Sequence, residues 1–197
     1  MKADLKNEIV RKAPWSIIAS LGIAFALLAF CLPQTSMAAT AAEINRDVNV
    51  ALSDLYRSTP AAKKMAGIAK GILVFPDIIK GGFIIGGQYG EGALRVGGKT
   101  QGYYRSVAAS YGLQIGAQKF GYALFFLSDD DLKYLKNSGG WEIGVGPSVV
   151  IVDEGMARSL TTTTARSGVY AFFFDQKGLM AGLGIQGSKI TEIQPGK

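Results

Sequence analysis

Glycine at alternating positions is the feature that most limits how this chain can fold. Twenty-five of its 26 glycines follow residue 38, and many recur at every second place in short apolar segments, as Gly112, Gly116, Gly144 and Gly146 illustrate. Because successive strand residues point to opposite faces, such spacing leaves strand faces without side chains. A face of this kind either lets a helix or a second sheet approach closely or lines a groove for a ligand, and we expect close packing at most positions.

Short apolar runs bounded by turn residues predict strands from residue 72 onward. One interruption predicts a helix: Ser128 can cap a segment that ends near Asn137 and opens with three carboxylates, Asp129–Asp131, at the positive helix end. The candidate strands are residues 72–75, 83–85, 93–96, 103–115, 122–127, 141–152, 169–174, 179–185 and 188–193.

Helices are predicted before the strands. Thr40 and Glu43 fit a capping box, in which a hydroxyl and a carboxylate satisfy free amides of the first turn. An apolar face follows at helical spacing, formed by Ile44, Val48, Leu52 and Leu55. Residues 39–197 are therefore predicted to form one α+β domain, with N-terminal helices packed on a Gly-rich, mainly antiparallel and barrel-like sheet.

The second predicted helix has Thr59 as its N-cap and Pro60 at its first position, and it ends at Gly71. Lys63 and Lys70, seven residues apart, lie over one another on its polar face, and Lys64 lies at the flank. The apolar face comprises Ala61, Met65, Ile68 and Ile72. Such a basic amphipathic helix is typical of membrane surfaces, although the pattern also fits a helix that covers a sheet and leaves its lysines in water.

The first 38 residues predict an export signal. Four basic residues precede an uncharged stretch over residues 16–30, and Ser36 and Ala38 place small side chains before Ala39. The stretch is shorter than the ~20 residues that span a bilayer, which favours cleavage over an uncleaved anchor. We expect a periplasmic or secreted protein that begins near Ala39 and associates with membranes.

Cys31 is the only cysteine, and lipid attachment there is a less favoured alternative. A lipoprotein cysteine normally follows a small residue, whereas Phe30 precedes this one. Cleavage after Ala38 leaves no cysteine, so an apolar core rather than disulfides must hold the fold.

The charge balance narrows the classes of partner. Of 21 basic and 15 acidic residues, four and two lie in the first 38, so the remainder carries a net charge of +4. This mild excess suits anionic lipid surfaces and is too weak for a dedicated nucleic-acid binder. The chain contains no histidine, which excludes imidazole bases, His-containing triads and His-bearing metal sites.

Acidic residues cluster at Asp129–Asp131 and at Asp153 and Glu154. Paired carboxylates can hydrolyse glycosides or hold calcium. The first cluster is better explained as helix-start charge and the second as a loop beside Gly155, since neither carries a supporting motif. We therefore predict no enzyme activity, metal or cofactor, and a hydrolase using the Asp153–Glu154 region is an open alternative.

Motifs follow one another in a recognisable order through the sheet-forming part of the chain. They are residues 80–87 (KGGFIIGG), 110–118 (SYGLQIGAQ), 143–148 (IGVGPS) and 168–188 (GVYAFFFDQKGLMAGLGIQGS). As an ordered set they resemble the SYLF domain family, whose closing signature is an aromatic strand, a Lys-Gly-Leu turn and a Gly-rich strand ending in Gly-Ser. The resemblance covers about residues 60–193.

The resemblance implies a lipid-binding module. The family includes eukaryotic proteins that bind phosphoinositides through a basic amphipathic helix, yeast actin-patch proteins that bind actin filaments, and exported or lipid-anchored bacterial members. It implies headgroup contacts at Lys63, Lys64, Lys70 and Lys80 and acyl contacts at Met65, Ile68 and Ile72. Here Tyr104-Arg105-Ser106 replaces the family's usual Trp-Ser pair, so we expect bacterial phospholipids as the ligand.

Two alternatives remain, one for the position of the lipid-binding site and one for the class of protein. The lipid site could be a glycine-lined sheet face instead of the basic helix. A small outer-membrane β-barrel would explain the aromatic strands, but most candidate strands are shorter than the ~9–11 residues needed, and the chain ends in Gly196-Lys197 rather than an aromatic residue.

Overall fold

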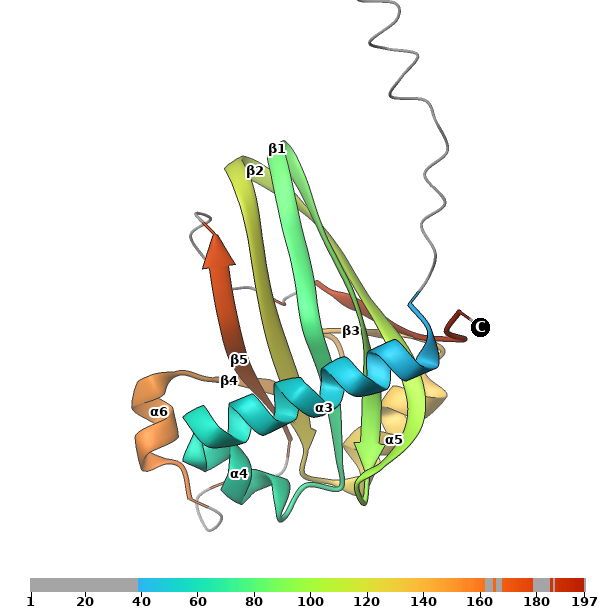
Figure 1. The fold of residues 1–197 in the computed structure, drawn as a ribbon, viewed down its shortest axis with the longest axis vertical. Coiled ribbons are helices and arrows are strands. Elements are labelled where there is room, and N and C mark those ends of the chain that lie inside the picture. The colour runs from blue at the N-terminus through green and yellow to red at the C-terminus, as the bar shows by residue number, and fades with distance from the viewer. Residues whose placement is uncertain (1–38, 162–164, 166–167, 179–184, 186, 197) are drawn as a thin grey trace, which may run out of the picture. The chain divides into compact units, whose positions relative to one another are not determined.

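The computed structural model describes residues 39–161, 165, 168–178, 185 and 187–196, and the predicted signal peptide lies outside them. Figure 1 shows a curled sheet crossed by one long helix. The elements in the described ranges are α3 (Ala41–Ser58), α4 (Pro60–Ala66), β1 (Gly71–Val96), β2 (Lys99–Phe126), α5 (Asp129–Asn137), β3 (Trp141–Glu142), β4 (Val149–Val152), α6 (Glu154–Ser159), β5 (Val169–Gly178) and β6 (Lys189–Ile193).

A single antiparallel ribbon of β1 and β2 forms the centre of the sheet. Its register runs from Gly71 opposite Phe126 to Val96 opposite Lys99, with three shifts that bend it. Gly97 and Gly98, at φ values of 57° and 77°, form the two-residue turn. The prediction of separate short strands over residues 72–127 was wrong, because most of the glycines between them lie within the ribbon rather than in turns.

The remaining strands pair along the other edge of β2. Residues 103–107 of β2 pair with β6 and residues 118–126 pair with β5, both antiparallel. β3 extends the sheet beyond β6, and β4 pairs with β5 in parallel. The predicted α+β class with a mainly antiparallel sheet is confirmed. The predicted strand over residues 141–152 is instead two short strands, and that over 179–185 lies mostly outside the described residues.

The second half of β1 crosses its first half at very short range. A β-carbon on Gly92 would overlap the carbonyl oxygen of Val74, and one on Gly90 would overlap that of Asp77. Gly121 on β2 leaves the space that the ring of Phe174 fills. At these positions glycine provides close packing, which allows the ribbon to curl.

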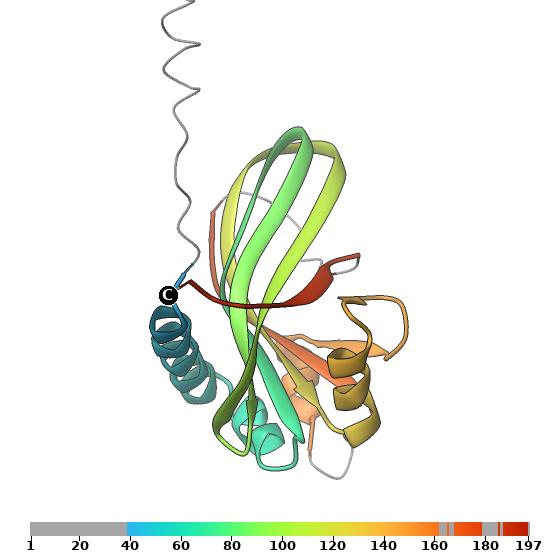
Figure 2. The same cartoon turned by 90° about the vertical axis from the view of Figure 1, so that its right-hand side faces the viewer.

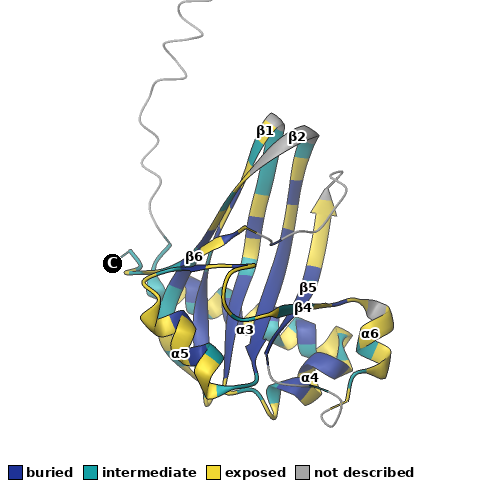
Figure 3. Cartoon of the chain, turned by 180° about the vertical axis from the view of Figure 1, so that it is seen from behind, coloured by how far each residue is buried: buried dark blue, intermediate teal, exposed yellow. Residues whose placement is uncertain are grey.

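Hydrophobic side chains pack on both faces of the curled sheet. Figure 2 shows α3 and α5 on opposite sides of it. On the α3 side, Val48, Leu55 and Met65 pack with Val74 and Phe125, among others. On the other side, Leu132 and Leu135 of α5 join a cluster that contains Phe75, Tyr122, Trp141 and Ile190. Figure 3 shows buried residues concentrated in the half of the ribbon near the helices.

Local capping motifs explain where most helices begin. Both bonds of the predicted capping box form, with the Thr40 amide 2.8 Å from Glu43 Oε2 and the Glu43 amide 3.3 Å from Thr40 Oγ1. Ser128 caps α5 as predicted, accepting a hydrogen bond from the Asp131 amide at 3.1 Å. The two ends of the described domain meet, since the Gly196 amide donates to the Ala39 carbonyl at 3.1 Å.

The helix predicted to reach Gly71 stops at Ala66, with Gly67 as its C-cap. The prediction failed because the chain turns at Gly67 and enters the sheet, where the Lys70 amide donates to the Phe126 carbonyl at 2.8 Å. A second correction concerns α6, because the only helix predicted after residue 72 was the one near Ser128.

Candidate functional site

A cleft of about 620 Å³ lies between α4 and α6. Phe172 of β5, Val152 of β4 and Leu160 supply its apolar surface, and both helices contribute to its rim. The ring of Phe173 points to the opposite face of β5, where it packs against Phe120 and Tyr122. Among the described residues, its lining is Ser58, Thr59, Pro60, Ala61, Lys64, Val152, Asp153, Ala157, Arg158, Leu160, Thr161, Phe172 and Phe173. Its volume falls in the range of small-molecule sites.

Pairing of β4 with β5 positions α6 beside this cleft. Val152, the last residue of β4, lies opposite Phe172 in the parallel register. The next residue, Asp153, caps α6 by accepting a hydrogen bond from the Met156 amide at 2.7 Å. The chain therefore leaves the sheet above an aromatic side chain and begins a helix at once.

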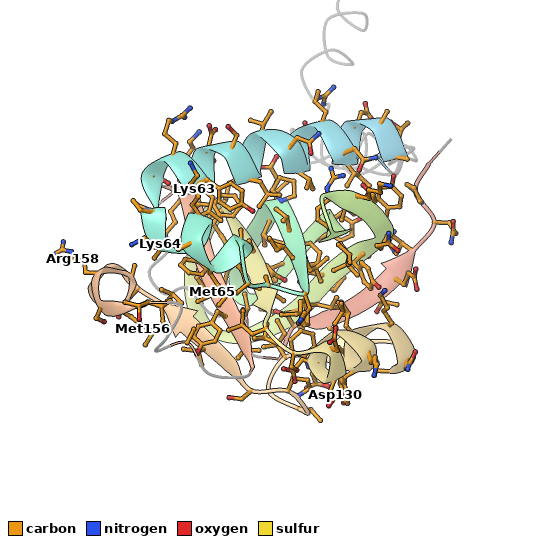
Figure 4. All side chains as sticks on the ribbon, turned by 90° about the horizontal axis from the view of Figure 1, so that it is seen from below. Lys63, Lys64, Met65, Asp130, Met156 and Arg158 are labelled. Carbon is orange, nitrogen blue, oxygen red and sulfur yellow. The ribbon has the colours of Figure 1, made fainter. Side chains whose placement is uncertain are left out.

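Cationic side chains from both helices border the cleft. Lys64 and Arg158 line it, and Lys63 is exposed on the same turn of α4. In Figure 4 the side chains of Lys63, Lys64 and Arg158 lie on one side of the molecule, away from Asp130 at the start of α5. Asp153 is the one carboxylate among the described residues of the lining, and it already accepts the capping bond. The cleft combines an apolar floor with a net positive rim, which attracts amphipathic anions.

The predicted acyl-contacting residues do not share one exposed surface. Met65 and Ile72 are 2% and 9% exposed and belong to the core on the α3 side. Their assignment to lipid contact is corrected, because α4 turns Met65 toward the sheet and Ile72 is itself a buried residue of β1. Ile68 is 40% exposed and remains accessible, as is Met156 of α6 at 37%.

The predicted headgroup-binding lysines are also spread over the fold. Lys63 and Lys64 lie near the cleft, but Lys70 lies beyond the end of α4 and lines a separate groove. Lys80 is a half-buried residue of β1 opposite the buried Gln118. At about 3.3 Å per residue it lies roughly 30 Å along the strand from Gly71. The proposed stack of Lys63 over Lys70 was wrong, because α4 ends between them.

Sequence reasoning missed Arg158 as a site residue. A helix signal was present, since Asp153 suits an N-cap and Arg158 suits a last helical turn. We interpreted this segment as a loop because Gly155 follows the two acids. That Arg158 shares a cleft with Lys64 depends on the β4–β5 pairing, which is not a local property.

The acidic clusters have structural positions at helix starts. Asp129–Asp131 form the first turn of α5, and Asp153 is the cap of α6. Within the described ranges, no three His, Cys, Asp or Glu residues form a group that could hold a metal ion. Among the described residues there is also no helix with the length and apolar character needed to cross a membrane.

Comparison with known proteins adds no identification. No protein-family model matches this sequence, and no curated protein matches it significantly.

Proposed function

We propose that this protein is an exported, non-enzymatic lipid-binding module of the SYLF type, which binds anionic phospholipid through the face formed by α4 and α6. The observation that carries the proposal is the cleft in which Lys64 and Arg158 border an apolar floor that includes Phe172 and Val152. The order of motifs that resembles the SYLF family supports the same class of function.

The arrangement suits both parts of a phospholipid. A phosphate at the rim would be attracted by Lys64 and Arg158, and an acyl chain would replace water against the aromatic floor. Lys63 of α4 and Met156 of α6 are exposed, as is Ile68 just beyond the end of α4, and these side chains would meet the surrounding membrane surface. A lysine near an anionic bilayer contributes about 1 kcal/mol, so a few such contacts give measurable binding.

Vesicle co-sedimentation tests this proposal. The double variant Lys63→Gln/Lys64→Gln should bind vesicles containing phosphatidylglycerol roughly thirtyfold more weakly than wild type, from about 1 kcal/mol per lysine. Lys133→Gln/Lys136→Gln on α5 removes the same charge from two other exposed positions and is the matched control. Binding should fall at higher salt and be weak on phosphatidylcholine vesicles.

Two results would overturn the proposal. Equal losses in both double variants would mean that net charge alone drives binding. Unchanged binding of the α4 variant would place any lipid site elsewhere on the protein.

A further inference from the structure

A second groove, of about 470 Å³, lies between α3, the segment that follows α4, and the β1–β2 turn. We call it the Arg95 groove. Its lining is Asn49, Leu52, Tyr56, Ala66, Gly67, Ala69, Lys70, Gly71, Ile72, Arg95, Gly97 and Gly98. None of these residues lines the α4–α6 cleft, so the two sites are independent.

Arg95 is held in the groove by neutral partners. Its Nη1 donates to Thr100 Oγ1 at 2.5 Å, and its Nη2 donates to Asn49 Oδ1 at 2.8 Å and to the Asn45 carbonyl at 3.3 Å. Thr100 donates in turn to Asn45 Oδ1 at 2.7 Å, which links α3 to the ribbon. The enclosed Nε has no hydrogen-bond partner. The guanidinium is thus fixed in place before any ligand arrives.

The groove carries positive charge that no carboxylate balances. The part of its lining that the structure describes contains Lys70 and Arg95 but no Asp or Glu. In the part of the chain that the structure describes, neither Lys70 nor Arg95 forms an ion pair. A half-buried charge without a counter-charge is costly, and a bound anion removes that cost.

We propose that the Arg95 groove binds a phosphate monoester, with the phosphate near Lys70 and Arg95 and the organic part against Leu52 and Ile72. Tyr56 also lines the groove, and its phenol, which is protonated at neutral pH, can donate a hydrogen bond. Arginine and lysine together are the usual protein partners of phosphate. The phosphate could belong to a soluble ester or to a lipid headgroup, and the groove offers the same chemistry to both.

Calorimetric titration of the purified protein distinguishes these sources with two probes, glycerol 3-phosphate and vesicles containing phosphatidic acid. Lys70→Gln should weaken binding of the preferred probe roughly five- to tenfold. Lys99→Gln, an exposed cation beside the turn but outside the lining, should bind as wild type does. Arg95→Gln should weaken binding further, and thermal melts of that variant report whether the α3 network survives.

Each outcome decides the proposal. Binding of glycerol 3-phosphate that Lys70→Gln lowers and Lys99→Gln does not lower supports a soluble ester. The same pattern on phosphatidic acid vesicles alone supports a headgroup, whereas a loss in Lys64→Gln on those vesicles reports on the α4–α6 cleft. No binding of glycerol 3-phosphate together with vesicle binding that Lys70→Gln leaves unchanged, or equal losses in Lys70→Gln and Lys99→Gln, would overturn the proposal without affecting the α4–α6 cleft.

Discussion

Gly92 packs directly on the main-chain carbonyl of Val74, at the point where the second half of β1 crosses the first. A β-carbon at Gly92 would overlap that oxygen, so the crossing requires a residue without a side chain. Val74 belongs to the core on the α3 side, and Leu94, two residues beyond Gly92, belongs to the core on the α5 side. The contact therefore couples the two cores through the backbone.

Replacing Gly92 by Ala should destabilise the protein by about 2–3 kcal/mol or more, because the backbone carbonyl and the Phe75 ring leave no space for the methyl group. Gly87→Ala is the matched control, since its β-carbon would lie an ordinary 3.6 Å from the Ala108 carbonyl oxygen. Urea unfolding followed by the fluorescence of the buried Trp141 measures both. Equal stability of the two variants would contradict the close crossing.

The raised pKa of Tyr104 predicts that the free energy of unfolding falls at alkaline pH. Burial, and to a lesser degree the charge of Glu192, raises its pKa to about 12. An unfolded tyrosine titrates near pH ~10, so the folded state holds this proton more tightly. The contribution of this proton to the free energy of unfolding is fully present below pH ~10 and is lost as the pH rises through ~10–12.

In Tyr104→Phe, the free energy of unfolding should therefore fall less steeply with pH, by up to about 1.4 kcal/mol per pH unit. Urea unfolding at intervals between pH ~9 and ~11.5 measures the slope, and Tyr134→Phe on α5 controls for loss of a more exposed phenol. Identical slopes in wild type and Tyr104→Phe would show that another group causes the alkaline loss.

Met65 and Ile68 should respond differently to the same substitution. Met65→Ser removes a buried side chain from the α3-side core and should cost about 2–5 kcal/mol of stability. Ile68→Ser changes a side chain that is 40% exposed, so stability should change little while vesicle binding falls. Thermal melts run beside co-sedimentation separate the effects, and a strong loss of stability in Ile68→Ser would show that Ile68 serves the core instead.

Export should remove the first 38 residues. Protein recovered from the periplasm or medium of a bacterial host should begin at or near Ala39, because the basic start, apolar stretch and small residues at Ser36 and Ala38 fit signal cleavage. Intact mass and N-terminal sequencing measure the start. Recovery of Met1, or of an acylated Cys31, would contradict this prediction.

Features set by neighbouring residues could be predicted from the sequence, and features set by distant pairing could not. The capping box at Thr40 and the cap at Ser128 depend on residues three apart, and both form. The alternation of apolar and small residues was sufficient to predict the α+β class. Gly67, in contrast, ends α4 four residues before the predicted stop, since tertiary pairing of the following segment outweighs local helix preference.

The candidate site was harder to predict because its two sides come from remote parts of the chain. Lys64 was identified from a helical charge pattern, whereas its neighbour Arg158 follows a parallel β4–β5 pairing that no local motif specifies. The long ribbon was missed for a related reason. The sequence does not distinguish a glycine that forms a turn from one that accommodates a crossing strand. For Gly92, only the contact with Val74 shows which it is.

The meeting of Ala39 and Gly196 gives the domain a single point of attachment. A helix of 18 residues separates that point from Ser58, at the edge of the α4–α6 cleft. At 1.5 Å per residue, α3 spans about 27 Å. A tag or surface linker joined to either end of the domain enters at the same place and leaves the cleft at the far end of α3 unobstructed. A circular permutant whose original ends are joined by a short linker should likewise keep the whole of α3 and the cleft beyond it.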